Sequence, residues 1–146
     1  PMAALAASAS PAQGGIYAAA QTRKTYAVLL DSARHLVQAG FTAIVDATFL
    51  QAAQRAAFAA LAVEAAVPFA IVDLDAPVDC LRDRILHRAA ARTDPSEANA
   101  EVLDAQLRHA QPLTKEELAV TVRVSSEQID PTRASTQIKA ILTGVP

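Results

Sequence analysis

The sequence is poor in glycine, cysteine and aromatic residues, and the shortages of glycine and cysteine each exclude a feature of known protein classes. Its 146 residues include four glycines, one cysteine and no tryptophan. Because the glycines stand at Gly14, Gly15, Gly40 and Gly144, the phosphate-binding pattern G-x-x-x-x-G-K-S/T is absent. The single cysteine, Cys80, excludes an internal disulfide framework and is typical of the reducing cytoplasm.

Strong charge and long apolar runs are missing as well. A net charge of −2 gives no electrostatic reason to expect nucleic acid or an anionic membrane as the main partner. No apolar run approaches the roughly 20 residues that cross a bilayer, and residues 1–8 lack the basic segment of a secretory signal. The 52% hydrophobic content is instead that of a globular domain with its own core. We therefore predict one cytoplasmic domain without a membrane partner.

What is present is an alternation of helical and strand-like segments, which predicts an α/β fold with a parallel sheet. Residues 1–16 are small and polar and predict a loop. Helices are expected at about 18–39, 48–66, 77–92, 102–107 and from 130 onward, and strands at 41–46, 69–73 and 120–124. These strands are fewer than the roughly five or six of a usual sheet, so the predicted sheet is incomplete.

Several helix ends can be predicted from a few residues. Gly40 and Gly144 supply stops for the first and last helices, because glycine adopts the left-handed backbone conformation at low cost. The dipeptide Asp130-Pro131 is typical of a helix start. The run Thr114–Glu117 fits a capping box, in which the threonine and glutamate side chains each bond the other's backbone amide.

An aspartate closes the apolar run Phe41–Asp46. In α/β nucleotide-binding proteins, the carboxyl end of a parallel strand is where ligands and metal ions collect. Asp46 is therefore a candidate magnesium ligand, and Thr48 could help to place the same metal-bound water. The alternative is structural: Asp46 merely ends a strand and accepts a bond from the Thr48 amide, while Thr48 caps the next helix. The pattern alone leaves both interpretations open.

Three arginines form a stripe along the helix expected at 77–92. Arg84, Arg88 and Arg92 follow one another at intervals of four residues, so they lie on one helix face. The planar guanidinium group binds phosphate oxygens in pairs, which makes the stripe a candidate phosphate contact. The alternative is a solvated basic face paired with Asp83 and Glu97, and on the residues alone it is the simpler interpretation.

Four stretches, taken in order, carry a resemblance to a known family. They are Gly15–Tyr26, Ile44–Leu50, Ala76–Arg84 and Asp94–Thr114, the last of which includes Gln106 and Pro112-Leu113-Thr114. In this order they resemble bacterial P-loop kinases of the AAA-type ATPase group. These are similar to zeta-toxin, gluconate-kinase and polynucleotide-kinase domains, and they are often fused to an aminoglycoside-phosphotransferase-like domain. The likeness covers nearly the whole chain from about residue 14.

The resemblance implies a three-layer, parallel-sheet fold like that of P-loop NTPases. Residues 1–16 would be a loop remnant, and 17–146 the carboxyl-terminal two-thirds of a kinase-like domain, with a lid at about 84–112. The Walker A strand and loop of the family would precede Pro1. That strand lies between the strands ending at Asp46 and Asp73 in the family, so the sheet is expected to have a gap there.

The resemblance also implies ATP and Mg²⁺ as cofactors and a small molecule, of unknown identity, as phosphate acceptor. The nucleotide or metal would be bound by Asp46, Thr48, Arg88 and Ser125, with Asp46 holding Mg²⁺ through water, and the catalytic lid residues would be Arg84, Arg88 and Arg92. We expect a kinase fragment that binds ATP weakly and is inactive alone. The alternatives are a degenerate, non-catalytic nucleotide-binding-like or interaction module and, less closely, an unrelated flavodoxin-like domain.

Overall fold

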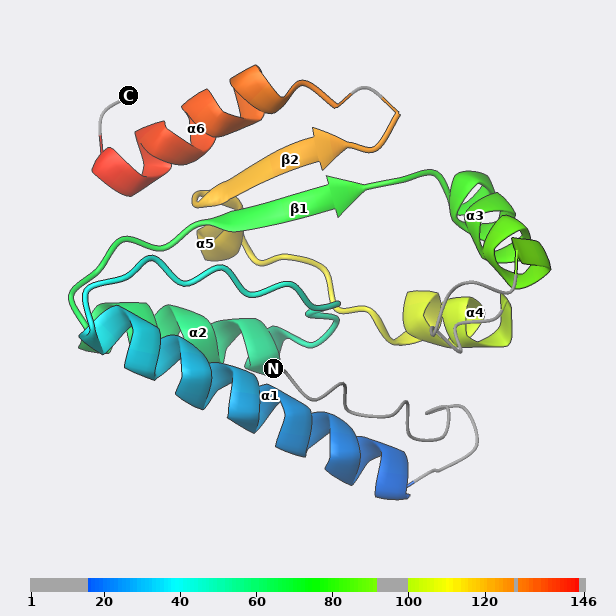
Figure 1. The fold of residues 1–146 in the computed structure, drawn as a ribbon, viewed down its shortest axis with the longest axis horizontal. Helices are drawn as coiled ribbons and strands as arrows, with labels where there is room; N and C mark the ends of the chain where they lie inside the picture. The colour runs from blue at the N-terminus through cyan, green and yellow to red at the C-terminus, as the bar shows by residue number, and fades with distance from the viewer. Residues whose placement is uncertain (1–15, 92–99, 128, 145–146) are drawn as a thin grey trace. The chain divides into compact units, whose positions relative to one another are not determined.

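The computed structural model describes residues 16–91, 100–127 and 129–144, which form an α/β arrangement as predicted (Figure 1). Two compact units can be distinguished. Unit 1 combines the chain up to Tyr26 with Pro77–Ala110, and unit 2 combines Ala27–Ala76 with Gln111 to the end. The elements are α1 (Ile16–Gln38), α2 (Ala52–Glu64), β1 (Ile71–Asp75), α3 (Val78–Ala91), α4 (Ala100–His109), α5 (Lys115–Leu118), β2 (Thr121–Ser125) and α6 (Pro131–Thr143).

The sheet of unit 2 consists of β1 and β2, which run parallel with Ile71 opposite Thr121 and Asp75 opposite Ser125. The pairing extends past both ends: the Ile71 amide donates to the Val120 carbonyl, and the Ser126 amide donates to the Asp75 carbonyl, each at 2.8 Å. The predicted parallel pairing is confirmed, with β1 displaced by two residues and β2 by one from the expected positions.

The predicted strand at Phe41–Asp46 is wrong. The segment is irregular in the structure, although its burial alternates: Ala43 and Val45 are half-buried, whereas Ile44 and Asp46 are exposed. Ile44 is 90% exposed. Such alternation is typical of an extended chain with one covered face. In the described part of the molecule, no strand pairs with this segment, so it has no backbone ladder and does not form a strand.

Helices α1 and α2 end in the same hydrogen-bond pattern. At the end of α1, the Phe41 amide donates to the Leu36 carbonyl at 3.0 Å, with Gly40 between them at a φ of 83°. The predicted stop at Gly40 is thus confirmed as a Schellman motif. At the end of α2 the corresponding left-handed position is held by Ala66, at a φ of 52°. An alanine there is strained, because its Cβ crowds the backbone in this region.

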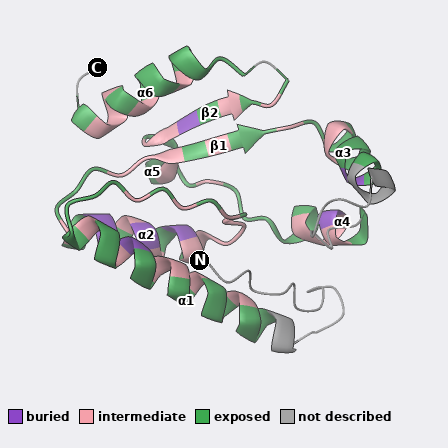
Figure 2. Cartoon of the chain, in the orientation of Figure 1, coloured by how far each residue is buried: buried purple, intermediate pink, exposed green. Residues whose placement is uncertain are grey.

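The core of each unit is small. In unit 2 the buried apolar side chains come mainly from α2 and β2; they are Ala33, Phe58, Leu61, Ala62 and Val122 (Figure 2). In unit 1, Ile85 of α3 and Leu103 of α4 are buried, and an exposed ion pair, Arg82 Nη2 to Asp104 Oδ1 at 3.1 Å, joins the same two helices. The connection from α1 to α2, which belongs to unit 2, carries the candidate metal ligand.

Candidate functional site

The candidate site is the turn from Asp46 to Gln51, which leads from the apolar segment into α2. Asp46 and Thr48 are exposed, and the residue after them, Phe49, has a left-handed backbone with a φ of 46°. A residue in this conformation is not helical, and α2 begins after it, at Ala52, with Gln51 as its N-cap. The predicted cap at Thr48 is therefore wrong, and the structure leaves Thr48 within the turn beside Asp46.

Aromatic packing and a distant glutamine fix the far side of the turn. The Phe49 ring meets Phe58 edge to face, with centroids 5.2 Å apart and planes at 86°. The Gln111 amide donates to the Leu50 carbonyl at 2.8 Å, and the Gln111 side-chain oxygen accepts from the Ala52 amide at 2.7 Å. The turn is thus tied both to α2 and to the segment that follows α4.

The centre of this arrangement is Arg55 of α2, which is only 6% exposed. Its Nη1 donates to the carbonyls of Phe49 and Gln111 at 3.0 and 3.2 Å. Its Nη2 donates to the Pro112 carbonyl at 3.0 Å and to Glu117 Oε2 at 3.0 Å, and its Nε donates to Glu117 Oε1 at 2.7 Å. A guanidinium group has five N–H donors, so every donor of this buried cation has a partner.

Glu117 neutralises Arg55 and also closes the predicted capping box. Its carboxylate accepts from the Thr114 amide at 2.8 Å, and the Thr114 hydroxyl accepts from the Glu117 amide at 3.2 Å, which confirms the box. The hydrogen bond from Arg55 lowers the pKa of Glu117 below its usual value; burial opposes this effect and the Thr114 amide supports it. The charged pair is therefore the stable form at neutral pH.

The structure distributes the predicted site residues between the two units. Asp46, Thr48 and Ser125 belong to unit 2, and Arg84 is exposed on α3 of unit 1. The backbone of Arg88 lies in α3, its side chain is outside the described residues, and so is all of Arg92. Ser125 ends β2, and its hydroxyl accepts from the Glu127 amide at 3.3 Å, a contact typical of a turn serine.

Sequence reasoning missed Arg55, although a signal was present. Arg55 is the single charged residue in the first twelve positions of α2, within the otherwise apolar and neutral stretch Ala52–Val63. A lone arginine among alanines on a buried helix needs a carboxylate and further acceptors. Apart from Phe49, its partners lie about sixty positions away, and no local pattern connects them to it.

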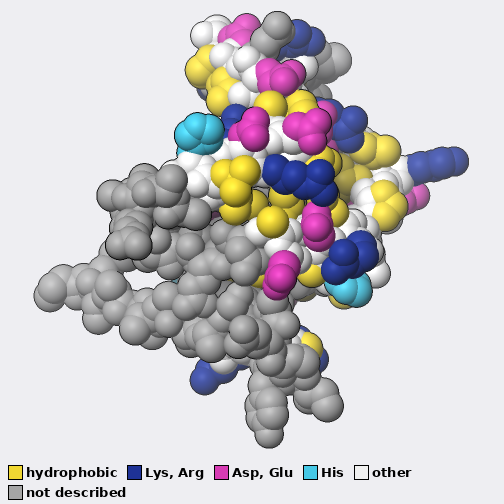
Figure 3. Space-filling model, turned by 90° about the vertical axis from the view of Figure 1, so that its right-hand side faces the viewer, with side chains coloured by type: hydrophobic (Ala, Val, Ile, Leu, Met, Phe, Trp, Pro, Cys, Tyr) yellow, Lys and Arg dark blue, Asp and Glu magenta, His cyan; other side chains and the backbone are white. Residues whose placement is uncertain are grey.

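The described side chains limit how a metal could be held and which surfaces the chain could bind. Within the described ranges, His, Cys, Asp and Glu side chains nowhere gather in groups of three that could hold a metal. A cation at Asp46 would therefore need water and phosphate oxygens to complete its ligands. The described side chains on the face drawn in Figure 3 mix both signs of charge. None of the helices described has the combination of length and apolarity that a membrane span requires.

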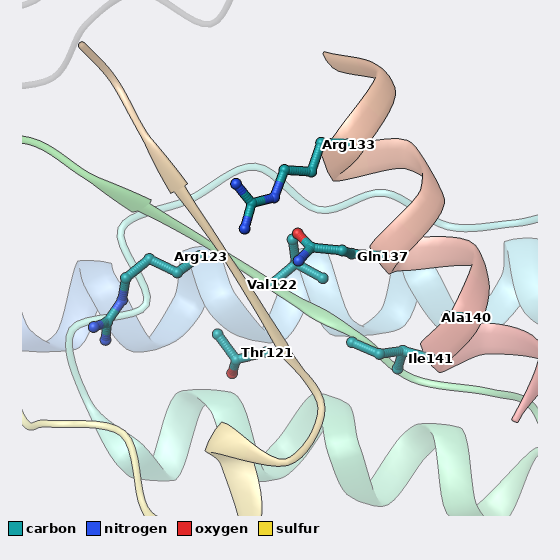
Figure 4. Close-up of a pocket in the computed structure, with 7 residues that line it drawn as sticks. All are labelled: Thr121, Val122, Arg123, Arg133, Gln137, Ala140 and Ile141. Atoms are coloured by element: carbon teal, nitrogen blue, oxygen red, sulfur yellow. The ribbon is translucent and has the colours of Figure 1, made fainter. Parts of the chain in front are cut away.

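A shallow groove of about 480 Å³ lies elsewhere in unit 2, between β2 and α6 (Figure 4). Arg133 and Gln137 extend from α6 toward β2, whereas Arg123 lies across the strand and pairs with Asp73, Nε to Oδ2 at 3.0 Å. No predicted site residue lines this groove.

Two parallel strands with helices between them make the described chain an α/β protein. The family model described as "AAA domain" matches residues 2–113, more than half of the chain. The chain belongs to this AAA-domain family, whose fold is that of P-loop NTPases. No curated protein and no solved structure matches the sequence.

Proposed function

We propose that this chain is the metal-binding and lid-bearing part of an ATP-dependent phosphotransferase domain. The observation that carries the proposal is an exposed carboxylate, Asp46, on a turn that buried contacts hold in place, in a member of a P-loop NTPase-like family. A carboxylate oxygen is the ligand type that Mg²⁺ selects, and Mg²⁺ in such sites keeps several waters and adds phosphate oxygens. The residues present therefore fit Mg²⁺ bound with ATP.

The roles follow from charge. Mg²⁺, when bound with ATP, would supply neutralisation of phosphate charge. Asp46 and Thr48 would hold the hydrated metal, and Ser125, at the carboxyl end of β2, would contact the nucleotide. Arg84, Arg88 and Arg92 would donate paired hydrogen bonds to phosphate oxygens and stabilise negative charge on the group transferred to a small-molecule acceptor.

Backbone pairing supports the proposal that a further strand completes the sheet. Ile71 and Asp75 of β1 direct their hydrogen-bonding groups toward β2, so the groups of Val72 and Leu74 point to the opposite edge. Those two side chains are 47% and 71% exposed. A parallel strand between β1 and Phe41–Asp46, with a phosphate loop at its end, would satisfy both edges. Without such a loop, this chain binds ATP weakly and transfers no phosphate.

Titration of the 146-residue chain with Mg·ATP and with Mn²⁺ tests the metal role. We expect millimolar Mg·ATP affinity by calorimetry, and selective broadening by Mn²⁺ of the amide NMR signals of Ala47 and Thr48. Asp46→Asn should abolish that broadening, whereas Asp31→Asn, a substitution of another exposed acid of unit 2, should leave it unchanged. Equal broadening in both variants would remove Asp46 from the proposed site.

A second candidate is a degenerate module that binds a partner and performs no chemistry. The absence of G-x-x-x-x-G-K-S/T from the sequence favours it. Under this alternative, Asp46→Asn changes neither metal nor nucleotide binding. The same titrations therefore separate the two functions.

A further inference from the structure

One buried guanidinium group connects two segments that are far apart in the sequence. Arg55 binds the Phe49 carbonyl on the turn that carries Asp46, and it binds the Gln111 and Pro112 carbonyls on the segment after α4. Gln111 is also the residue at which the chain enters unit 2 from unit 1. The Arg55 side chain therefore holds both the turn that carries Asp46 and the last residues of the segment predicted as the lid, at about 84–112.

The hydrogen bonds of Arg55 indicate that it orients the backbone more than it stabilises the fold. Burying a charged pair costs desolvation that well-packed apolar residues would avoid, so an ion pair alone is weak evidence for stabilisation. Arg55, however, directs three of its five hydrogen bonds to backbone carbonyls, where no apolar side chain could substitute. Planar guanidinium donors fix those carbonyls in both distance and direction.

Backbone strain at Phe49 indicates that the turn needs the Arg55 hydrogen bond to keep its conformation. Phe49, a bulky residue, has a φ of 46°, and a non-glycine residue keeps this strained left-handed conformation only where its surroundings enforce it. The contacts that enforce it include the Arg55 bond to its carbonyl and the Phe58 ring against its side chain. If the Arg55 bond is lost, the strain can relax by rotation of the backbone between Asp46 and Gln51.

We infer that Arg55 is a positioning residue for the metal site: it holds the Asp46–Gln51 turn in its strained form and ties it to Gln111. The inference rests on the proposed function of Asp46. Groups that orient metal ligands typically change metal affinity by about 10–100-fold when they are removed. Arg55 does not itself touch the metal, so its effect must pass through the turn.

The test uses the full chain, Mn²⁺ as the probe, and amide NMR broadening at Ala47 and Thr48 as the readout. Arg55→Met keeps the length of the side chain and removes every donor. We expect it to weaken Mn²⁺ binding about tenfold, with Arg55→Lys intermediate because its ammonium can still reach some carbonyls. The matched control is Arg34→Met, which removes an arginine bonded to Glu64 at the same 2.7 Å distance but at an exposed position. It should leave Mn²⁺ affinity unchanged.

A second variant covers the case in which Arg55→Met fails to fold. Glu117→Gln keeps the shape of the partner and weakens the hold on Arg55 without touching the turn. A reduction of Mn²⁺ affinity in this folded variant, with the spectrum outside residues 46–51 and 111–117 preserved, supports positioning. Unchanged Mn²⁺ affinity in folded Arg55→Met, or in Glu117→Gln if the former does not fold, overturns the inference and leaves Asp46 in place. Failure of Asp46→Asn to alter the Mn²⁺ signal overturns the proposed function first, and this inference with it.

Discussion

Replacing Glu117 by glutamine should destabilise the fold far more than breaking an equally short ion pair at the surface. The Arg55–Glu117 and Arg34–Glu64 pairs both have an N–O distance of 2.7 Å. Their side chains differ in exposure, at 6% and 15% for the first pair and 33% and 63% for the second. Distance is matched, so the comparison contrasts two pairs that differ in burial and in the number of hydrogen bonds that the carboxylate accepts.

The expected magnitudes follow from that difference. Removing one partner of a buried pair costs about 3–5 kcal/mol, because the remaining charge stays buried without compensation. Glutamine keeps one oxygen acceptor for Arg55, so we expect Glu117→Gln to lower the free energy of unfolding by about 2–3 kcal/mol. Glu64→Gln should cost less than about 1 kcal/mol, since solvent screens the exposed pair.

Urea unfolding followed by circular dichroism measures both values, and the double variant Arg55→Met/Glu117→Gln completes a cycle. The coupling energy should be at least about 1 kcal/mol, as for other contacting groups. A coupling near zero would refute the reasoning, because it would mean that the two side chains act independently in the folded protein. The m-value should stay constant, which confirms that the unfolded state is comparable among the variants.

Three further predictions can be checked by the same unfolding assay. Arg55 lowers the folded-state pKa of Glu117. The unsubstituted chain should therefore keep its full stability advantage over Glu117→Gln above the unfolded glutamate pKa of about 4.3, and this advantage should shrink as the pH falls below that value. An advantage that persists at acid pH would contradict this. Ala66→Gly should stabilise the chain by about 0.5–1 kcal/mol by relieving the left-handed strain, whereas Ala65→Gly, at a φ of −84°, should destabilise it. Leu61→Ala should cost about 2–5 kcal/mol because the side chain is buried, while Val63→Ala, two positions along the same helix but 81% exposed, should lie within about 0.5 kcal/mol of the unsubstituted chain.

The features that could be predicted from the sequence are those that depend on neighbouring residues. Gly40 stops α1, Thr114 and Glu117 form their capping box, and Gly144 ends α6 with a φ of 65°. Asp130 caps α6 through the Arg133 amide at 2.9 Å, with Pro131 as its first residue. Each of these signals acts within a few residues, so the sequence contains both the cause and its effect.

The features that could not be predicted depend on contacts distant in the sequence. Phe41–Asp46 has the composition of a buried strand, but a strand needs a partner ladder, and composition does not reveal whether one is present. The start of α2 at Ala52 depends on Phe49, whose backbone is held by Arg55 and Phe58. The place of Asp46 after an apolar run predicts it as a ligand, whereas the group that fixes its turn lies on another element.

The open edge of the sheet has a practical consequence for anyone who works with this chain. Leu74 of β1 is 71% exposed, and Phe41 and Ile44 of the irregular segment before α2 are 66% and 90% exposed; an open strand edge with exposed apolar side chains favours edge-to-edge aggregation. Preparations should therefore become turbid more readily as concentration rises, and charged substitutions such as Ile44→Lys should delay clouding without unfolding the domain. Light scattering during concentration would measure this aggregation.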